Sequence, residues 1–427
     1  MNHNDVIENI GAYIRYLRIQ NGMTQEELAN GICSVPYLSK VENNRLIPSE
    51  EIVNLLLKKL GIQIKEIDHF VHTFRQKLTE GNYAIKIKDR KSATKVFEEI
   101  KNYEQQIIHF PQVLWDFYLF LLKYFLFIKE EITESKKIIR TIENIKNQLN
   151  TQQKMSFYHL KGVYCCLNKN YEEGLILLKK AQVYMEQTKE FNPELYYHLG
   201  LTYSYLNNII LAINYSTIAL NHFNESANYL RSLDCQIILG INYLRIEEYE
   251  KSQFYFNNVH NIIDTFDIKD LKGTILHNLG YLYFKKKEYQ NAIEYFLQSL
   301  NHKNENNINY SNTILYLVCA YQNLKEIDKA NEWIKKGLNY AQMHEDKTNF
   351  IKLKILEYQL KNLDEDYRVF LEETAIPYFK QKKDLPNLCE CLEYLANLYF
   401  RERKYKLASI NYRLLNNFQK QINKRNI

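Results

Sequence analysis

The sequence predicts an all-α protein in which a small N-terminal helical domain is followed by a long array of paired helices. The chain of 427 residues has only 12 glycines and 6 prolines, a composition that disfavours sheets with tight turns and favours long helices. Apolar residues make up 46% of the chain, so it can bury a large core. Two short amphipathic segments near the N-terminus, and a unit that recurs along the remainder, divide the chain into these two parts.

The first short segment, residues 24–29, has the pattern of a helix start. Thr24 can cap the helix, and Glu27 stands three residues later, which completes a capping box. Leu28 and Ala29 follow at helical spacing and are expected to face inward.

The second short segment, residues 34–42, follows after a tight turn. Leu38 and Val41 supply its inward face. The outward positions are Ser34, Pro36, Tyr37 and Lys40. A short helix with a polar, partly basic outer face, supported by a partner helix, has the shape that enters the major groove of DNA. The second segment is therefore the candidate DNA-reading helix.

Residues 10–62 resemble the lambda-repressor-type (XRE-like) helix-turn-helix domain. The matching positions are Ile14, Arg18, residues 24–29, residues 38–43, Pro48, Leu57, Leu60 and Gly61. The match departs at the turn, where residues 31–33 are one residue shorter than in the common form and Cys33 replaces the usual glycine. PlcR-like and NprR-like regulators share that shortening.

The resemblance implies roles for particular residues. Ser34, Pro36, Tyr37 and Lys40 are expected to face base edges, and Gln25 and Asn43 to hold phosphates. Arg45, just after the reading helix, completes the predicted DNA-binding set. Arg18 and Glu42 are implied to form a buried structural pair. The alternative is a small helical bundle that binds no DNA.

Charge alone does not predict DNA binding. The formal net charge of +6 is small for this length, and residues 1–70 hold seven Lys and Arg against nine Asp and Glu, a charge of −2. DNA affinity must then come from local placement of cations, from dimerisation, or from both, and a single domain is expected to bind weakly and in a salt-sensitive way.

The connection to the rest of the chain is predicted to be helical, because apolar residues recur at spacings of three and four from Ile64 to Phe74. The sequence thus divides into a DNA-binding domain (residues 1–64), a linker helix (65–74) and a repeat domain (75–427). A stiff linker could transmit a change of geometry from one domain to the other.

The recurring unit is clearest at Leu279, Gly280 and Tyr283, followed by Ala292 and Phe296. Its first-helix position recurs at 81, 123, 162, 200, 240, 280, 318, 357 and 396, and the poorest copy carries a lysine at 123. Small residues suit places where two helices cross closely, and large rings fill the gaps between pairs. The unit resembles the tetratricopeptide repeat. About nine such repeats are expected to stack into a right-handed superhelix with a concave inner face.

The first helix of each repeat is expected to line that inner face. Extended peptides offer alternating donors and acceptors that Asn and Gln can satisfy, and rings add contact area at little entropic cost. The predicted peptide-binding residues are Tyr197, His198, Tyr205, Arg245, His277, Asn278, Tyr281, Asn312, Gln322 and Asn323. The alternative is that these are solvated polar residues, since Asn is common throughout the chain.

No catalytic, cofactor or metal motif is found in the sequence. The seven cysteines, at 33, 165, 166, 235, 319, 389 and 391, have no zinc-ligand spacing and are expected to be free thiols in a reducing cytosol. Residues 1–8 are polar and have no apolar signal core, and the most apolar run, 117–128, is too short to span a bilayer. We therefore expect a cytoplasmic protein that is not an enzyme.

Together the two parts resemble the RRNPP family of peptide-pheromone receptors, and its NprR-like members most in length and repeat number. The resemblance implies a quorum-sensing transcription factor that binds operator DNA and is switched by a short re-imported peptide. It further implies a homodimer, with a tetramer in the presence of peptide left open, and binding of a sporulation phosphorelay response regulator in the peptide-free form. The alternatives are a protein–protein interaction adaptor and a Rap-like sporulation regulator without sequence-specific DNA binding.

Overall fold

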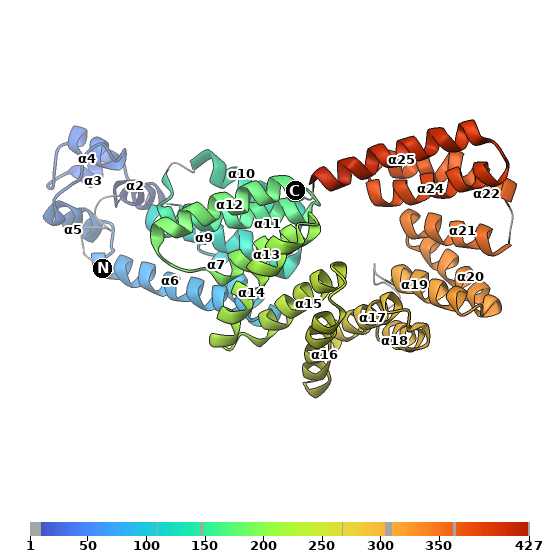
Figure 1. The fold of residues 1–427 in the computed structure, drawn as a ribbon. Helices are drawn as coiled ribbons and strands as arrows, with labels where there is room; N and C mark the ends of the chain where they lie inside the picture. The colour runs from blue at the N-terminus through green and yellow to red at the C-terminus, as the bar shows by residue number, and fades with distance from the viewer. Residues whose placement is uncertain are drawn as a thin grey trace. The chain divides into compact units, whose positions relative to one another are not determined.

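The structure, a computed structural model, describes residues 10–108, 110–145, 148–266, 268–303, 310–361 and 364–425. Every regular element in these ranges is a helix, which confirms the predicted all-α class. The chain divides into two compact units, residues 1–198 and 199–427, which are described in turn. Figure 1 labels their helices in chain order.

The described residues of the N-terminal domain form four short helices. Leu28, Ala29, Leu38 and Val41 are buried, so the positions predicted to face inward on the two short segments do so. The predicted capping box is confirmed, because the Thr24 amide donates to Glu27 Oε2 at 2.6 Å and the Glu27 amide donates to Thr24 Oγ1 at 3.1 Å. The four helices are α2 (Ile10–Gln20), α3 (Gln25–Ala29), α4 (Val35–Glu42) and α5 (Glu50–Lys59).

The turn between α3 and α4 keeps a glycine although Cys33 replaces the usual one. Gly31 takes a left-handed conformation, with φ of +79°, which costs glycine little and costs residues with a Cβ more. The left-handed residue that the shortened turn needs is therefore Gly31, two residues before Cys33.

The predicted linker is part of a longer helix, α6 (Ile64–Lys86), which continues without a break into the first repeat. Val71, Phe74 and Leu78 bury its inner side. At its start the repeats also touch the DNA-binding domain, since the Phe110 ring centroid lies 4.5 Å from that of Tyr13 and 5.8 Å from that of Phe70. Within this unit the connection is therefore a packed helix.

The rest of the first unit consists of antiparallel helix pairs. In the pairs α6–α7, α9–α10 and α11–α12 the two helices contact each other. A π-helical segment, η1, extends α9 before the chain turns into α10. The helices are α7 (Arg90–Lys101), α8 (Glu104–Ile107), α9 (Pro111–Tyr124), η1 (Phe125–Lys129), α10 (Ile132–Ile145), α11 (Thr151–Leu167), α12 (Tyr171–Thr188) and α13 (Pro193–Tyr205), whose last residues belong to the second unit.

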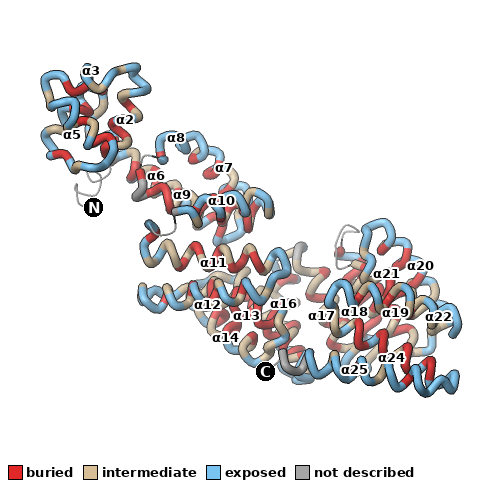
Figure 2. Tube along the Cα trace, turned by 90° about the horizontal axis from the view of Figure 1, so that it is seen from above, coloured by how far each residue is buried: buried red, intermediate tan, exposed pale blue. Residues whose placement is uncertain are grey.

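The second unit continues the same pattern. Successive helices pack against each other from α14 to α22, and α24 packs against α25. Figure 2 shows how burial concentrates on the sides of the helices that face their neighbours. The helices are α14 (Ile209–Glu225), α15 (Tyr229–Arg245), α16 (Tyr249–Thr265), α17 (Lys269–Lys285), α18 (Tyr289–His302), α19 (Tyr310–Asn323), α20 (Ile327–Met343), α21 (Lys347–Lys361), α22 (Asp364–Phe370), η3 (Leu371–Ala375), α23 (Ile376–Gln381), α24 (Leu385–Arg401) and α25 (Tyr405–Arg425).

Close helix crossings explain the glycines of the repeat. A Cβ on Gly240 would lie 2.4 Å from the Phe256 ring, and one on Gly280 would lie 2.6 Å from the Phe296 ring. Such short separations would force one helix of each pair away from the other. The prediction that these positions must be small, with a ring filling the adjoining space, is thus explained by direct contact.

The turns between the two helices of a pair share a left-handed residue that is not glycine. The second residue after the end of the first helix is left-handed at Lys169, Asn207, Glu247, Lys287 and Lys325, with φ between 59° and 64°. Such a residue satisfies the last carbonyls of a helix and is most often glycine. Here lysine, asparagine and glutamate take the role, which helps to explain how so many turns form with so few glycines.

Candidate functional site

The first candidate site is the outer face of α4. Ser34 caps this helix, because its Oγ accepts a hydrogen bond from the Tyr37 amide at 3.3 Å, and Pro36 lies in the first turn. Ser34, Pro36 and Lys40 are exposed, whereas Tyr37 is half-buried and packs partly against the core. The outer face of α4 is therefore polar, and the Tyr37 ring is held in place by its contact with the core.

The buried pair implied by the family resemblance holds α4 to α2. Arg18 Nε donates to Glu42 Oε1 at 2.6 Å and Arg18 Nη2 donates to Glu42 Oε2 at 2.9 Å, a bidentate geometry. The Glu42 side chain is 1% exposed and the Arg18 side chain 12% exposed. Hydrogen bonding to Glu42 raises the pKa of Arg18. Arg18 also donates to the Met23 carbonyl at 2.8 Å, so the pair fixes the loop before α3 as well.

Gln25 joins this network. Its Nε2 donates to Glu42 Oε2 at 2.7 Å, so the side chain expected to hold a phosphate has a partner inside the domain. Asn43 is exposed, and its Nδ2 donates to the Ser39 carbonyl at 2.8 Å. Arg45 is exposed beyond the end of α4. Of the predicted DNA-binding residues, Gln25 is thus the one whose side chain bonds to the buried Arg18–Glu42 pair.

The second candidate site is a cleft of about 390 Å³ in the second unit. The first helices of three successive pairs, α15, α17 and α19, supply most of its wall, as expected for an inner face. Five predicted peptide-binding residues line it: Arg245, His277, Asn278, Tyr281 and Asn312. Its other lining residues are Ile241, Leu244, Glu247, Phe256, Lys285 and Tyr316.

Asn278 carries an unsatisfied donor in this wall. Its Nδ2 is shielded from solvent and has no hydrogen-bond partner among the described residues. A buried polar group without a partner costs about 1–3 kcal/mol, so such groups are rare unless something else satisfies them. The amide is therefore placed to donate to an acceptor that enters the cleft.

His277 presents a neutral ring to the same cleft. Burial, reinforced by the Lys303 charge, lowers the pKa of His277 to about 3. Lys303 Nζ donates to Thr313 Oγ1 at 2.7 Å, and Thr313 Oγ1 lies 3.0 Å from His277 Nδ1. Burial also lowers the pKa of Lys303 to about 8.

Aromatic rings and cations complete the wall. The ring centroids of Tyr281 and Tyr316 lie 4.6 Å apart, and Lys285 Nζ lies 5.6 Å from the Tyr281 centroid. Arg245 Nη1 donates to the Ser204 carbonyl at 2.6 Å, which anchors its guanidinium. Such a surface offers apolar contact area beside both donors and cations.

The other predicted peptide-binding residues lie elsewhere. Tyr197 and His198 belong to the first unit, where buried His198 Nδ1 lies 3.0 Å from His159 Nε2 and 2.7 Å from the Glu194 carbonyl. Tyr205, Gln322 and Asn323 do not line the cleft; Tyr205 is 57% exposed, and exposed Asn323 donates to the Cys319 carbonyl of its own helix.

Sequence reasoning missed Tyr316 and Phe256. Tyr316 stands four residues after Asn312, one turn along the same helix face, so the helical period could have found it. Phe256 comes from a second helix, α16, and the expectation that first helices line the inner face excluded it.

Neither a membrane span nor a metal centre is found in the part of the chain that the structure describes. Its helices include none that is long and apolar enough to cross a membrane. The described residues also contain no group of three or more His, Cys, Asp or Glu side chains that could hold a metal ion.

Comparison with known proteins agrees with this architecture. Residues 14–67 match the helix-turn-helix family model, and residues 273–306 match the tetratricopeptide repeat model. The chain is 30% identical over 404 residues to the transcriptional activator NprA of Geobacillus stearothermophilus, covering 92% of this chain and 99% of that protein.

Two solved structures extend the likeness to three dimensions. The apo form of the quorum sensor NprR from B. thuringiensis has a TM-score of 0.73 at 25% identity, covering 82% of this chain and 99% of that chain. NprR in complex with its cognate peptide NprX has a TM-score of 0.65 at 25% identity, covering 81% and 98% respectively.

Proposed function

Because this chain belongs to the RRNPP family of peptide-pheromone receptors, with NprA and NprR, we propose that it is a transcriptional regulator switched by a short re-imported peptide. In this proposal α4 reads operator DNA, and the cleft between α15, α17 and α19 holds the peptide. The role is regulatory rather than enzymatic, and its place is the cytoplasm, where both the DNA and a re-imported peptide are found. The NprR–NprX complex supports a peptide ligand for this family.

The single observation that carries the peptide site is the unsatisfied Asn278 amide in the cleft wall. A peptide backbone supplies carbonyl acceptors at regular intervals, and Asn312, also in the lining, can pair with a neighbouring backbone group. The Tyr281 and Tyr316 rings provide the apolar contact that a side chain of the peptide needs.

Replacing Asn278 with Ala is expected to weaken peptide binding about ten- to a hundredfold, because a peptide carbonyl would then be buried without a donor. Calorimetry with the full chain and synthetic peptides encoded just downstream of its gene measures the change. Asn312→Ala should act in the same direction.

Asn323→Ala is the matched control, because Asn323 is exposed and donates only within its own helix. If the Asn278→Ala, Asn312→Ala double variant binds peptide as tightly as the parent, the peptide site lies elsewhere.

We also propose that the active regulator is a homodimer, since two DNA-binding domains of weak individual affinity gain by reading two half-sites. The last helix, α25, supports this proposal. Leu407, Ile410 and Leu414 recur on it at spacings of three and four and are 40%, 38% and 39% exposed. Such an apolar stripe can pack against the same stripe of a second copy of the chain about a two-fold axis.

The dimer proposal predicts that Ile410→Glu with Leu414→Glu raises the dimer dissociation constant at least about tenfold, since two apolar contacts and their mirror images are lost. Analytical ultracentrifugation measures it with and without peptide. Ser409→Glu, an exposed position of the same helix that lies off the stripe, should change the constant little. A parent protein that sediments as a monomer at micromolar concentration under both conditions would rule the dimer out.

A further inference from the structure

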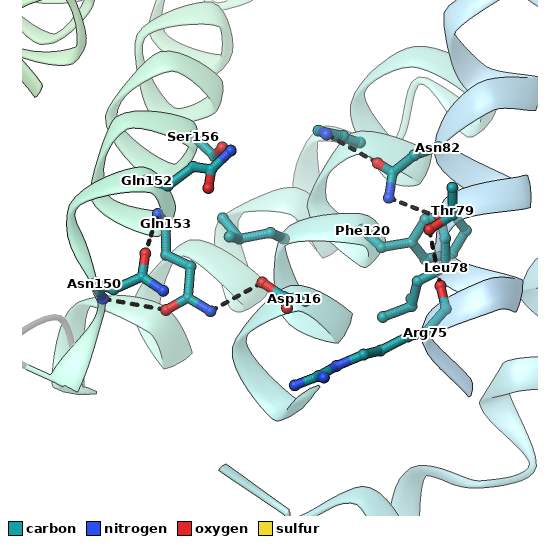
Figure 3. A pocket seen from close by; sticks show the side chains of 12 residues that line it. Arg75, Leu78, Thr79, Asn82, Asp116, Phe120, Asn150, Gln152, Gln153 and Ser156 are labelled. Carbon is teal, nitrogen blue, oxygen red and sulfur yellow. Dashed lines mark hydrogen bonds between the residues drawn. The ribbon is translucent and has the colours of Figure 1, made fainter. Parts of the chain in front are cut away.

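A second cleft lies in the first unit, and none of the residues assigned above to DNA or peptide lines it. Its volume is about 470 Å³, and three successive first helices, α6, α9 and α11, enclose it with the residue that caps α11. Polar side chains dominate its lining, as Figure 3 shows for Asn82, Asp116 and Gln153.

The cleft carries one net positive charge. Arg75 and Lys123 are its cations and Asp116 its anion. Gln153 Nε2 donates to Asp116 Oδ1 at 2.9 Å, so that carboxylate has a neutral partner. Arg75 extends from α6 into the cleft (Figure 3). The lining therefore holds two cationic side chains and one anionic side chain.

Lys123 is the least compensated of these groups. Its Nζ donates to Asn82 Oδ1 at 2.8 Å, and Asn82 is held by its own bond to the Leu78 carbonyl at 2.8 Å. Among the described residues no carboxylate lies within ion-pair distance of it. Burial lowers the pKa of Lys123, and the charges of Glu194 and Asp116 offset that effect only in part.

An ammonium has three donors, and this one uses a single amide acceptor, so two remain for another group. Withdrawing a charge from water is costly unless an opposite charge compensates it. Most other copies of the repeat carry Gly or Ala at the position equivalent to 123, although Val318 and Glu357 also depart from that pattern. Lys123 therefore offers charged donors to a group that enters the cleft.

We propose that this cleft binds the carboxylate of an anionic ligand, with Lys123 as the charged anchor. A carboxylate has one charge, which matches the single net charge of the lining. A phosphate dianion fits less well, because Asp116 lies in the wall and Glu190 beside it accepts from Gln152 at 2.6 Å. Ser156, also in the lining, supplies a hydroxyl for a second contact.

The site is independent of the proposed peptide cleft, since all of its lining residues precede residue 157. The carboxylate could belong to a free small molecule or to a polypeptide. Propionate, a monocarboxylate, represents the first source and N-acetyl-alanyl-alanine the second, and the C-terminal amide of that dipeptide is the neutral match.

The test is calorimetry with the full chain at constant ionic strength, comparing the parent with Lys123→Met. Propionate or the free dipeptide should bind the parent and bind Lys123→Met at least about tenfold more weakly, because the charge contact with Lys123 is lost. The dipeptide amide should not bind. The tighter of the two carboxylates identifies the source.

Two control variants separate this proposal from the peptide site. Lys285→Met removes a lysine from the other cleft, and Asn278→Ala removes its unsatisfied donor, so both should bind the carboxylate probes as the parent does. Equal binding by parent and Lys123→Met, equal binding of acid and amide, tighter binding of inorganic phosphate, or no binding of either carboxylate at millimolar concentration would each overturn the proposal.

Discussion

Replacing Glu42 with Ala is expected to destabilise the DNA-binding domain by about 3 kcal/mol, because it leaves the guanidinium of Arg18 without its carboxylate in a largely buried site. The value is placed at the low end of the range for broken buried pairs, since Arg18 remains 12% exposed and keeps its bond to the Met23 carbonyl. Gln25 would lose its acceptor at the same time. A domain of this size has only a few kcal/mol to lose, so α3 and α4 should unfold well before the repeats.

Hydrogen exchange of the α3 and α4 amides, with thermal unfolding of the whole chain, measures this effect. Glu26→Ala is the matched control, because Glu26 is an exposed glutamate on α3 and its removal changes the charge equally. Replacing both Arg18 and Glu42 with leucine should restore much of the stability, since no buried charge is then left alone. Equal protection in Glu42→Ala and Glu26→Ala would contradict the role assigned to the pair.

The sequence was informative where the determinants are local. The capping box of Thr24 and Glu27 lies within four residues, and the inward positions of Leu28, Leu38 and Val41 follow from helical period alone. The glycine crossings could also be anticipated, because a small residue that recurs once per helix pair indicates a place where the two helices approach closely. These features needed no knowledge of contacts between distant parts of the chain.

The residues that line the peptide cleft were harder to predict from the sequence, because contacts between neighbouring repeats determine which side chains face it. His198 meets His159, 39 residues away, and although this is about the length of one repeat, the repeat spacing does not predict that the two rings touch. The helices of an array are buried on more than one side, so their apolar pattern does not identify the face that lines a cleft. The missing partner of Asn278 is likewise a property of its neighbours. Sequence reasoning could select the helices, but not every side chain on them.

The reading face of α4 leads to the last prediction. Tyr37→Phe with Lys40→Ala should weaken operator binding by about 2–6 kcal/mol if each side chain makes a good base contact and the two losses add. Phenylalanine is preferred to alanine at 37, because the Tyr37 ring packs partly against the core and only its hydroxyl should be removed. Lys40 is exposed, so its truncation should leave the fold intact.

The measurement is a gel shift on an operator first located by footprinting, repeated at several salt concentrations and on unrelated DNA. If Lys40 reads a base, its loss should weaken the operator more than unrelated DNA; if it only neutralises a phosphate, both should weaken alike and the salt slope should fall by about one. Lys58→Ala, an equal change of charge at the exposed end of α5, is the control. An unchanged operator affinity in the double variant would mean that α4 does not read DNA through Tyr37 and Lys40.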